Sequence, residues 1–571
     1  MTIELNTVSY LLLTAIFSAA SFIAIQNGKH PDVHPSVLNK QSDYATLRYP
    51  GESAIIKSNA FPNGAPQLTT RDRPIKTLSE LYQVALNKHK GKRFAGARDS
   101  TKKSVIWQSY DGAYEKTQHI YSGLIYKAKL EASTKKESSF VGIYASNSPD
   151  TFWTEMACHW GGLVTVPIAA QATSSHIVHV IRDTKLTTLV IDETHLEYVL
   201  HLVEGTSVNH IIALGEDANY KEQENYFGLS ITSFSQLQKL GKEHPMDRSE
   251  TSTSDSIASI YYSTNSHKVI LDVNDPEDGK SLGVVLTHKV GYIYKLKHNV
   301  LIFAIGILSI SSYLAEINIL YITTDNVLGY VLQAMTCFVG GSIGFEDKVL
   351  PNEFNLDVPS VLSAIKEVKP TIYASGGPFL KQVQKLILGK YGNSFLFQRG
   401  LERKDRYHKE GKLVSDCKYD MLVFRYIRQQ LFGGHIRMLY LDNDDVPKVD
   451  MGSFYRSVLG AQVLKTFSCP ETSSSMMTTV VFDYALEKRV VGPPLPSVRV
   501  KLVDKKEEGY TAEDSPNPRG EIHVAGSTVF VGYWNNPLAT VEAIDPDGWF
   551  STGIIGELLP NGSILLLESS K

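Results

Sequence analysis

Cysteine is scarce in this 571-residue sequence. Its four cysteines, Cys158, Cys337, Cys417 and Cys469, lie far apart and form no C-x-x-C pair. A disulfide framework or a zinc site is therefore not expected, and the sequence fits a reducing compartment. Isolated cysteines of this kind usually serve as small buried apolar side chains.

An excess of charge of either sign is also lacking. The chain has 57 Lys and Arg against 60 Asp and Glu, a formal net charge of -3. This balance predicts no polyanionic partner, and nothing in the sequence indicates nucleic-acid binding. Hydrophobic residues make up 43% and charged residues 20%, which is ordinary globular composition. The length allows two or three domains or one large multi-subdomain enzyme body.

The N-terminus holds a long uncharged run, residues 8–25, rich in Leu, Ile, Ala and Phe. A helix of this length, at about 1.5 Å per residue, comes close to spanning a bilayer core. We predict that residues 1–30 form a membrane anchor, a transmembrane helix that leaves the main domain in the cytosol. A signal peptide, a buried helix, and a hairpin or interfacial placement stay open as alternatives. The endoplasmic reticulum, a lipid droplet and the peroxisome surface all fit such an anchor.

Residues 31–75 have little periodicity and predict an extended leader. The next region predicts an α/β fold, because short apolar runs alternate with amphipathic helices. "FVGIYA" (140–145) has strand length, and Ser148 and Pro149 offer an N-cap and a first-turn proline for a helix that runs to Trp160. "LVTVPI" (163–168), "TLVID" (188–192), "HIIAL" (210–214) and "SIASIYYS" (256–263) predict further strands.

Three other stretches carry separate expectations. Residues 299–313 have no charge but are short for a membrane span, so a core helix and strand are a better interpretation than a second membrane segment. Residues 400–420 are highly charged and predict an exposed helix and loop. Residues 491–571 contain strand-like runs separated by Gly, Asn and Pro turns and predict a small β-rich subdomain.

Several of these segments together resemble the long-chain acyl-CoA synthetases, the fatty-acid–CoA ligases of the adenylate-forming, AMP-binding superfamily. The similar segments are "RYPGESAIIKS" (48–58), residues 141–168, "GVVLTHK" (283–289), "PETSSS" (470–475), "VGPPLPSVRVKLVD" (491–504) and "GYWNNPLATVEAIDPDGWFSTG" (532–553). They occur in the family's order, with sensible spacing, over about residues 45–571.

The resemblance implies a fold, substrates and cofactors. The fold is the family's large domain, with two parallel or mixed sheets flanked by helices over residues 76–490, followed by the β-rich subdomain. The implied activity joins a fatty acid to CoA at the expense of ATP, with Mg²⁺ as metal and CoA as cosubstrate. Fatty acid or acyl-CoA would therefore be the small-molecule partner.

The family's phosphate loop is the first motif from which this sequence departs. The family pattern is rich in glycine, whereas 20 residues separate Tyr262 from Gly283 here and no glycine occurs before Gly279. Ser263 and Thr264 keep hydroxyls and are candidate nucleotide contacts. Bulky and acidic side chains fill the rest of the stretch, and they would obstruct and repel a triphosphate. The stretch is therefore predicted to be an acidic surface loop.

The remaining motifs are partly kept. Glu471 retains the glutamate of the family's Y-G-x-T-E motif and is the candidate Mg²⁺ ligand, with Thr472 as a candidate hydroxyl contact. Ile554 replaces the aspartate that, by resemblance, would hold the ribose hydroxyls. "DNDD" (442–445) stands where small residues would pack on adenine. The resemblance implies that the C-terminal lid domain and its lysine would be absent from this chain, and no residue is assigned a catalytic role.

Three interpretations follow. The first is a membrane-tethered member of the family that is catalytically impaired, a pseudo-ligase. The second is a functional long-chain fatty-acid–CoA ligase whose gene model is truncated or incorrect. The third is a non-catalytic membrane scaffold that keeps only the fold.

Overall fold

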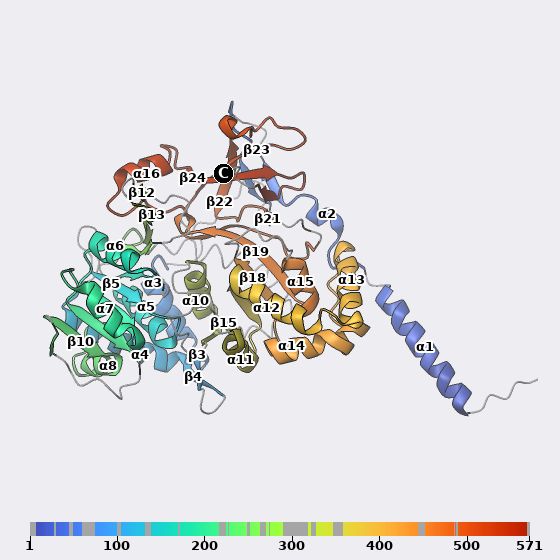
Figure 1. The fold of residues 1–571 in the computed structure, drawn as a ribbon, viewed down its shortest axis with the longest axis horizontal. Coiled ribbons are helices and arrows are strands. Elements are labelled where there is room, and N and C mark those ends of the chain that lie inside the picture. The colour runs from blue at the N-terminus through green and yellow to red at the C-terminus, as the bar shows by residue number, and fades with distance from the viewer. Residues whose placement is uncertain are drawn as a thin grey trace, which may run out of the picture.

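The computed structural model of the chain is built on three large β-sheets (Figure 1). The residues that the structure describes are 7–27, 30–44, 49–59, 75–99, 104–131, 139–169, 172–215, 224–226, 228–247, 252–262, 270–272, 275–288, 318–320, 327–345, 358–442, 451–484, 486 and 489–567. The expected core segment 299–313 lies outside these residues. The candidate nucleotide contacts Ser263 and Thr264 also lie outside them.

The first sheet has eight strands in the order β14-β11-β6-β5-β7-β8-β10-β9. Its strands are β5 (Phe140–Tyr144), β6 (Val164–Pro167), β7 (Thr188–Asp192), β8 (His210–Leu214), β9 (Glu224–Tyr226), β10 (Leu229–Ser233), β11 (Ile257–Tyr262) and β14 (Gly283–Thr287). The inner pairs are parallel, and only β9 and β14 run antiparallel to their neighbours. The expected strands near 140, 163, 188, 210 and 256 are therefore confirmed.

Helices cover both faces of this sheet, which explains why its strands are apolar throughout. In β7, Leu189 and Ile191 pack with α6 (Ser174–Thr184) and α7 (Leu196–Val203), whereas Val190 faces the opposite layer. The covering helices are α3 (Leu78–Lys88), α4 (Tyr110–Ala128), α5 (Pro149–Gly161), α6 (Ser174–Thr184), η1 (Glu193–His195), α7 (Leu196–Val203) and α8 (Phe234–Glu243).

Local sequence fixes the ends of α5. The Ser148 hydroxyl accepts a hydrogen bond from the Thr151 amide at 3.2 Å, and Pro149 occupies the first turn, where no amide partner is needed. Gly162 ends the helix with φ of 77°, a left-handed conformation that suits glycine. The predicted strand–helix–strand unit forms as expected.

The second sheet also has eight strands, in the order β20-β19-β18-β17-β15-β16-β3-β4. Its strands are β3 (Arg93–Asp99), β4 (Ser104–Ser109), β15 (Asn318–Leu320), β16 (Ser342–Phe345), β17 (Ile372–Gly376), β18 (Met438–Asp442), β19 (Gln462–Cys469) and β20 (Ser474–Thr478). Its helices are α10 (Val327–Val339), α11 (Val358–Val368), α12 (Gly377–Tyr391), α13 (Phe395–Lys409), η4 (Asp420–Phe424), α14 (Arg425–Phe432) and α15 (Met451–Leu459).

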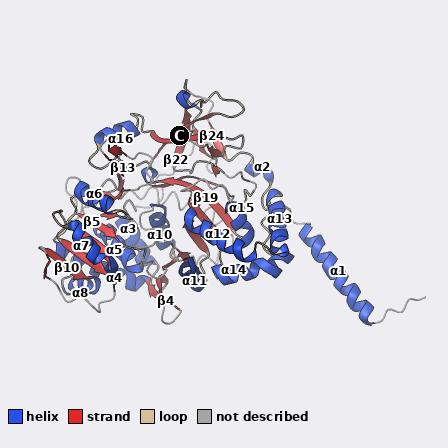
Figure 2. Ribbon diagram, viewed as in Figure 1, coloured by secondary structure: helices blue, strands red, loops and turns tan. Residues whose placement is uncertain are grey.

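The third sheet is antiparallel and lies at the top of the view, above the two helix-covered layers (Figure 2). Its seven strands are β1 (Ser42–Tyr44), β2 (Ile56–Ser58), β21 (Val490–Gly492), β22 (Val498–Val503), β23 (Arg519–Gly526), β24 (Phe550–Leu558) and β25 (Ile564–Leu566). The leader thus supplies two strands, and the Ser42 hydroxyl donates to the Gly562 carbonyl at 2.5 Å. The short elements around the sheet are α2 (Pro35–Leu38), η5 (Pro470–Thr472), η6 (Lys506–Glu508) and α16 (Pro537–Ala543).

The N-terminal uncharged run forms α1 (Thr7–Asn27), which extends away from the body of the molecule (Figure 1). Within the part of the chain that the structure places, no helix combines the length and the apolar character needed to cross a bilayer. The transmembrane anchor predicted over residues 1–30 is therefore not supported.

The charged stretch 400–420 is less exposed than the sequence predicts. The Lys404 side chain is only 1% exposed, and its ammonium donates to Asp420 Oδ1 at 2.7 Å and to the Ser457 carbonyl at 3.0 Å. Arg428 also pairs with Asp420. The prediction of an exposed helix and loop is wrong for these residues, because a buried ion pair can satisfy groups that look solvated in sequence.

Candidate functional site

Glu471 and Thr472 lie in η5, at the end of the central strand β19. The strand stops at Cys469, Pro470 begins the turn, and Ser473 reverses the chain into β20 with φ of 55°. Glu471 and Thr472 are each 1% exposed. The structure therefore brings the two retained motif residues together, but in a buried turn.

Tyr533 is a partner of Glu471 that the sequence did not reveal. Its hydroxyl donates to Glu471 Oε1 at 3.1 Å, and burial together with this carboxylate raises the pKa of the phenol. The segment "GYWNNP" signalled the family, but only the fold shows that its tyrosine reaches a residue 62 positions away.

The segment that carries Tyr533 also pairs with β14, the strand that follows stretch 263–282. The Trp534 amide donates to the Gly283 carbonyl at 2.7 Å, and Val284 forms a β-bridge with Tyr533. The Phe530 amide donates to the Glu471 carbonyl at 2.8 Å. Phe530 and Tyr533, although distant from Glu471 in sequence, thus surround it in the fold.

Thr472 turns its hydroxyl toward the protein interior. The hydroxyl donates to the Cys469 carbonyl at 3.1 Å and lies 3.3 Å from Cys469 Sγ. Burial raises the pKa of that thiol well above its usual value, so Cys469 stays protonated. Thr472 would have to give up the carbonyl contact in order to serve a nucleotide.

The stretch that replaces the phosphate loop is partly paired as a hairpin, where the sequence suggested an acidic surface loop. Strands β12 (Ile270–Asp272) and β13 (Asp275–Lys280) run antiparallel, with Ile270 opposite Lys280. Backbone amides that serve a strand partner are not available to cradle phosphate oxygens. Beyond β13, the Ser281 carbonyl lies 3.1 Å from His179 Nε2.

The residue just before this stretch is tied to α6. The Tyr262 hydroxyl donates to Asp183 Oδ2 at 2.5 Å, and burial with this bond raises the pKa of Tyr262. The Asn535 side-chain amide donates to the Asp183 carbonyl at 3.0 Å, as does Trp534 Nε1 at 3.3 Å. The segment that carries Tyr533 therefore contacts Gly283 directly and Tyr262 through Asp183, the residues on either side of stretch 263–282.

At the expected ribose position, Ile554 presents no acceptor. Its half-buried side chain packs against the main hydrophobic core. The carboxylate that contacts this segment is Glu521, which accepts from the Gly553 amide at 3.1 Å and from the Ser551 hydroxyl, and pairs with Lys505 at 2.6 Å. Burial opposes ionisation of Glu521, but the bonds from Lys505 and Ser551 prevail and lower its pKa.

A second set of buried polar side chains lies between β6, β11 and α10. His159 Nε2 lies 3.0 Å from Ser259 Oγ and 3.1 Å from Thr165 Oγ1. Burial, with His288 nearby, lowers the pKa of His159 to about 3, and burial lowers that of His288 to about 4. Both imidazoles are therefore neutral near pH 7.

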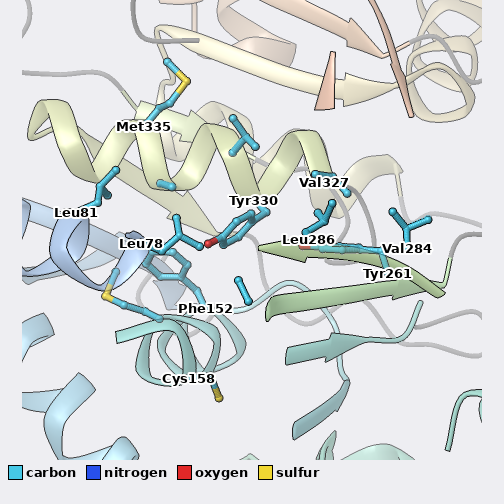
Figure 3. Close-up of a cluster of buried hydrophobic side chains, with 14 of the residues drawn as sticks. Leu78, Leu81, Phe152, Cys158, Tyr261, Val284, Leu286, Val327, Tyr330 and Met335 are labelled. Atoms are coloured by element: carbon cyan, nitrogen blue, oxygen red, sulfur yellow. The ribbon is translucent and has the colours of Figure 1, made fainter. Parts of the chain in front are cut away.

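Next to these histidines the interior is apolar. In Figure 3, α10 lies across α3 and α5, and Tyr330 points from α10 toward Leu78 and Phe152. The ring of Tyr330 lies 5.0 Å from that of His159.

ATP and Mg²⁺ fit these residues only in part. Glu471 could supply one carboxylate to a magnesium ion that is otherwise held by phosphates and water. Among the described residues no group of three or more His, Cys, Asp or Glu side chains could hold a metal ion. Ile554 cannot accept from the ribose hydroxyls, and Glu521 is already engaged. The described residues therefore do not form a complete nucleotide site.

Solved structures show the same fold. The chain aligns with the AMP-bound adenylation domain of the carboxylic acid reductase from Segniliparus rugosus with a TM-score of 0.62 and 16% identity, covering 87% of this chain and 75% of that one. It aligns with the N-terminal domain of FACL13 from Mycobacterium tuberculosis with a TM-score of 0.58 and 14% identity, covering 86% and 100%. The architecture is that of an adenylate-forming enzyme's large domain.

The profile of the AMP-binding enzyme family matches residues 84–267 and 279–534, more than half of the chain. The chain therefore belongs to this family and is a relative of the long-chain acyl-CoA synthetases, as the motifs predicted. The match is interrupted between residues 267 and 279, and strand β12 of the hairpin begins inside this gap, at Ile270.

Similar curated proteins are acyl-CoA synthetases. Fatty acyl-CoA synthetase A of Dictyostelium discoideum is 25% identical over 91% of this chain and 73% of its own length. Long chain acyl-CoA synthetase 6, peroxisomal, of Arabidopsis thaliana is 26% identical over 88% and 67%. Long-chain-fatty-acid–CoA ligase 6 of Mus musculus is 26% identical over 81% and 63%. The chain thus spans about two thirds of the length of these relatives.

Proposed function

We propose that this chain is a long-chain acyl-CoA synthetase homologue that binds fatty acid or acyl-CoA but is impaired in the ATP-dependent activation step. The lipid substrate class rests on the names of its relatives. The proposed impairment is supported by two departures that occur together: the altered phosphate-loop stretch and Ile554 in the ribose position.

The size of the ribose defect can be worked out. Loss of hydrogen bonds to a charged acceptor costs about 1.5–3 kcal/mol, or roughly ten- to a hundredfold in affinity. The loop defect adds to this cost, because acidic residues in "LDVNDPEDGK" (271–280) repel a polyanion. Together they support a nucleotide site too weak for efficient adenylation.

ATP–pyrophosphate exchange with palmitate tests the proposal. The protein is expressed from cDNA verified across residues 262–283 and past residue 571, and the Dictyostelium relative is assayed in parallel as the active control. We expect exchange from the control and none from this chain. Exchange at the control's rate would overturn the proposal.

A functional ligase is the second candidate, and the retained, buried Glu471 favours it. A transcript that encodes a glycine-rich loop in place of residues 263–282, or a further domain after residue 571, would support this candidate. A non-catalytic scaffold is the third interpretation, and saturable binding of palmitate without exchange would exclude it.

Membrane attachment belongs to the same proposal. α1 carries exposed apolar side chains, among them Leu11, Ile16 and Phe17, which are 67%, 62% and 76% exposed. Attachment through residues 1–30 would place the main domain on the cytosolic side of the endoplasmic reticulum, a lipid droplet or a peroxisome. Two Arabidopsis relatives are named as peroxisomal proteins.

A further inference from the structure

One helical layer of the second sheet has a charge opposite to that of the rest of the chain. Residues 377–432, which form α12, α13, η4 and α14, contain twelve Lys and Arg against five Asp and Glu. The remainder of the chain contains 45 against 55. The layer is therefore strongly basic in a molecule that is acidic elsewhere.

The acidic residues of the layer are mostly engaged within it. Asp420 is buried between Lys404 and Arg428, and Glu402, Asp405 and Glu410 each pair with a neighbouring basic side chain. Other basic side chains are exposed and have no carboxylate within ion-pair distance in the described part of the chain. These are Lys381, Lys385, Lys390, Arg406, Lys418 and Arg425.

Large apolar side chains project from the same layer. Met421, Leu422 and Tyr426 on η4 and α14 are 54%, 61% and 54% exposed, and Phe395 and Leu396 at the start of α13 are 68% and 42% exposed. We call these five residues and Arg425 the α13–α14 face.

Packing brings the two parts of the α13–α14 face close together. α13 crosses η4 where the rings of Phe397 and Phe424 lie 5.6 Å apart, and a Cβ on Gly400 would meet the Phe424 ring at 2.7 Å. Leu396 and Leu422 are within two residues of this crossing in sequence.

The exposed helix α1 leaves the body beside this layer. The Asp32 amide donates to the Gly411 carbonyl, and the Leu413 amide donates to Asp32 Oδ2, both at 2.9 Å. α1 ends at Asn27, and the chain from there to Pro31 can reach at most about 14 Å. The end of α1 is therefore tethered to the loop that follows α13, as Figure 1 shows.

We propose that the α13–α14 face rests on a membrane surface rich in anionic lipid. Basic side chains gain from the negative surface potential, and exposed Leu, Met, Phe and Tyr side chains gain from entering the headgroup boundary. A nucleic acid or an acidic protein would satisfy the charge, but a lipid interface accepts the aliphatic side chains as well. The inference extends the membrane attachment proposed above to a second surface, and because this surface is separate from the nucleotide site it does not depend on the proposed impairment.

Site-specific fluorescence tests the inference on the full chain. All four native cysteines are buried, so an introduced surface cysteine can be labelled selectively. An environment-sensitive dye is attached at Leu422→Cys or, as an independent second position, at Met421→Cys. The matched control is Leu538→Cys on α16, where the leucine is 78% exposed. Each protein is mixed with phosphatidylcholine vesicles with or without phosphatidylserine.

We expect a blue shift at 421 and 422 with the phosphatidylserine vesicles, and none at 538 or with phosphatidylcholine alone. Arg425→Glu, which changes the face by two charges, should lower the partition of the label about thirtyfold. A dye at 422 that stays in water while the protein co-sediments with vesicles would overturn the proposal. So would equal shifts at 422 and 538, or a shift produced by RNA or polyglutamate without lipid.

Discussion

Glu155 gives a prediction whose size follows directly from its surroundings. This α5 side chain is 5% exposed, and burial raises its pKa from 4.5 to about 8. A carboxyl with a raised folded-state pKa costs no stability below the unfolded value, because it is protonated in both states. As the pH rises from 4.5 to 8, only the unfolded state ionises, and the native state loses stability.

The magnitude follows from the size of the shift. At about 1.4 kcal/mol per pH unit, native Glu155 costs roughly 3 kcal/mol at pH 7 and about 5 kcal/mol above pH 8. Glu155→Gln removes the titration while keeping the shape of the side chain. We expect the variant to unfold at a temperature several degrees higher at pH 7 and above, and at the same temperature as the wild type near pH 4.5.

Apparent melting temperature, measured by differential scanning fluorimetry from pH 4.5 to 9, is the assay. Glu243→Gln, a change at an exposed glutamate of α8, is the matched control and should run parallel to the wild type. Parallel curves for Glu155→Gln and the wild type across the whole range would refute the reasoning, since Glu155 would then not be a neutral buried acid.

Three further predictions concern the site and its support. Tyr533→Phe removes the hydroxyl that donates to buried Glu471 and should destabilise the fold by about 1.5–3 kcal/mol, seen as a lower melting temperature. An unchanged melting temperature would mean that this hydrogen bond is absent. Ile554→Asp alone should leave pyrophosphate exchange undetectable, because the rebuilt loop remains, and measurable exchange would contradict this. Asp420→Asn should cost about 3–5 kcal/mol by leaving the Lys404 ammonium without its buried carboxylate, and a stability loss below 1 kcal/mol on urea unfolding would argue against the buried pair.

Local patterns predicted five of the eight strands of the first sheet, β5, β6, β7, β8 and β11, but not β9, β10 or β14. The unit of β5, α5 and β6 could be predicted because its signals are local: Ser148, Pro149 and Gly162 mark the ends of α5. Glu471 was identified only by its resemblance to the family motif, and strand β19 before it was not predicted. The burial of Glu471 could not be predicted either, since Tyr533 and Phe530 contact it only through tertiary structure.

Other features depend on contacts that sequence spacing does not encode. β1 and β2 join a sheet whose other strands begin beyond residue 489, so nothing near residue 42 signals the pairing. Lys404 looks like one charge among many on an exposed helix until Asp420 is seen to accept from it. The hairpin β12–β13 contains Asp and Pro, which disfavour strands, and local propensity therefore predicted a loop.

Direct binding of ATP·Mg²⁺ to the full chain, measured by equilibrium dialysis beside the Dictyostelium relative, tests the central claim that the nucleotide site is incomplete. The account predicts an affinity at least about tenfold weaker than that of the relative, because the ribose acceptor alone is worth that much. Equal affinities of the two proteins would contradict it.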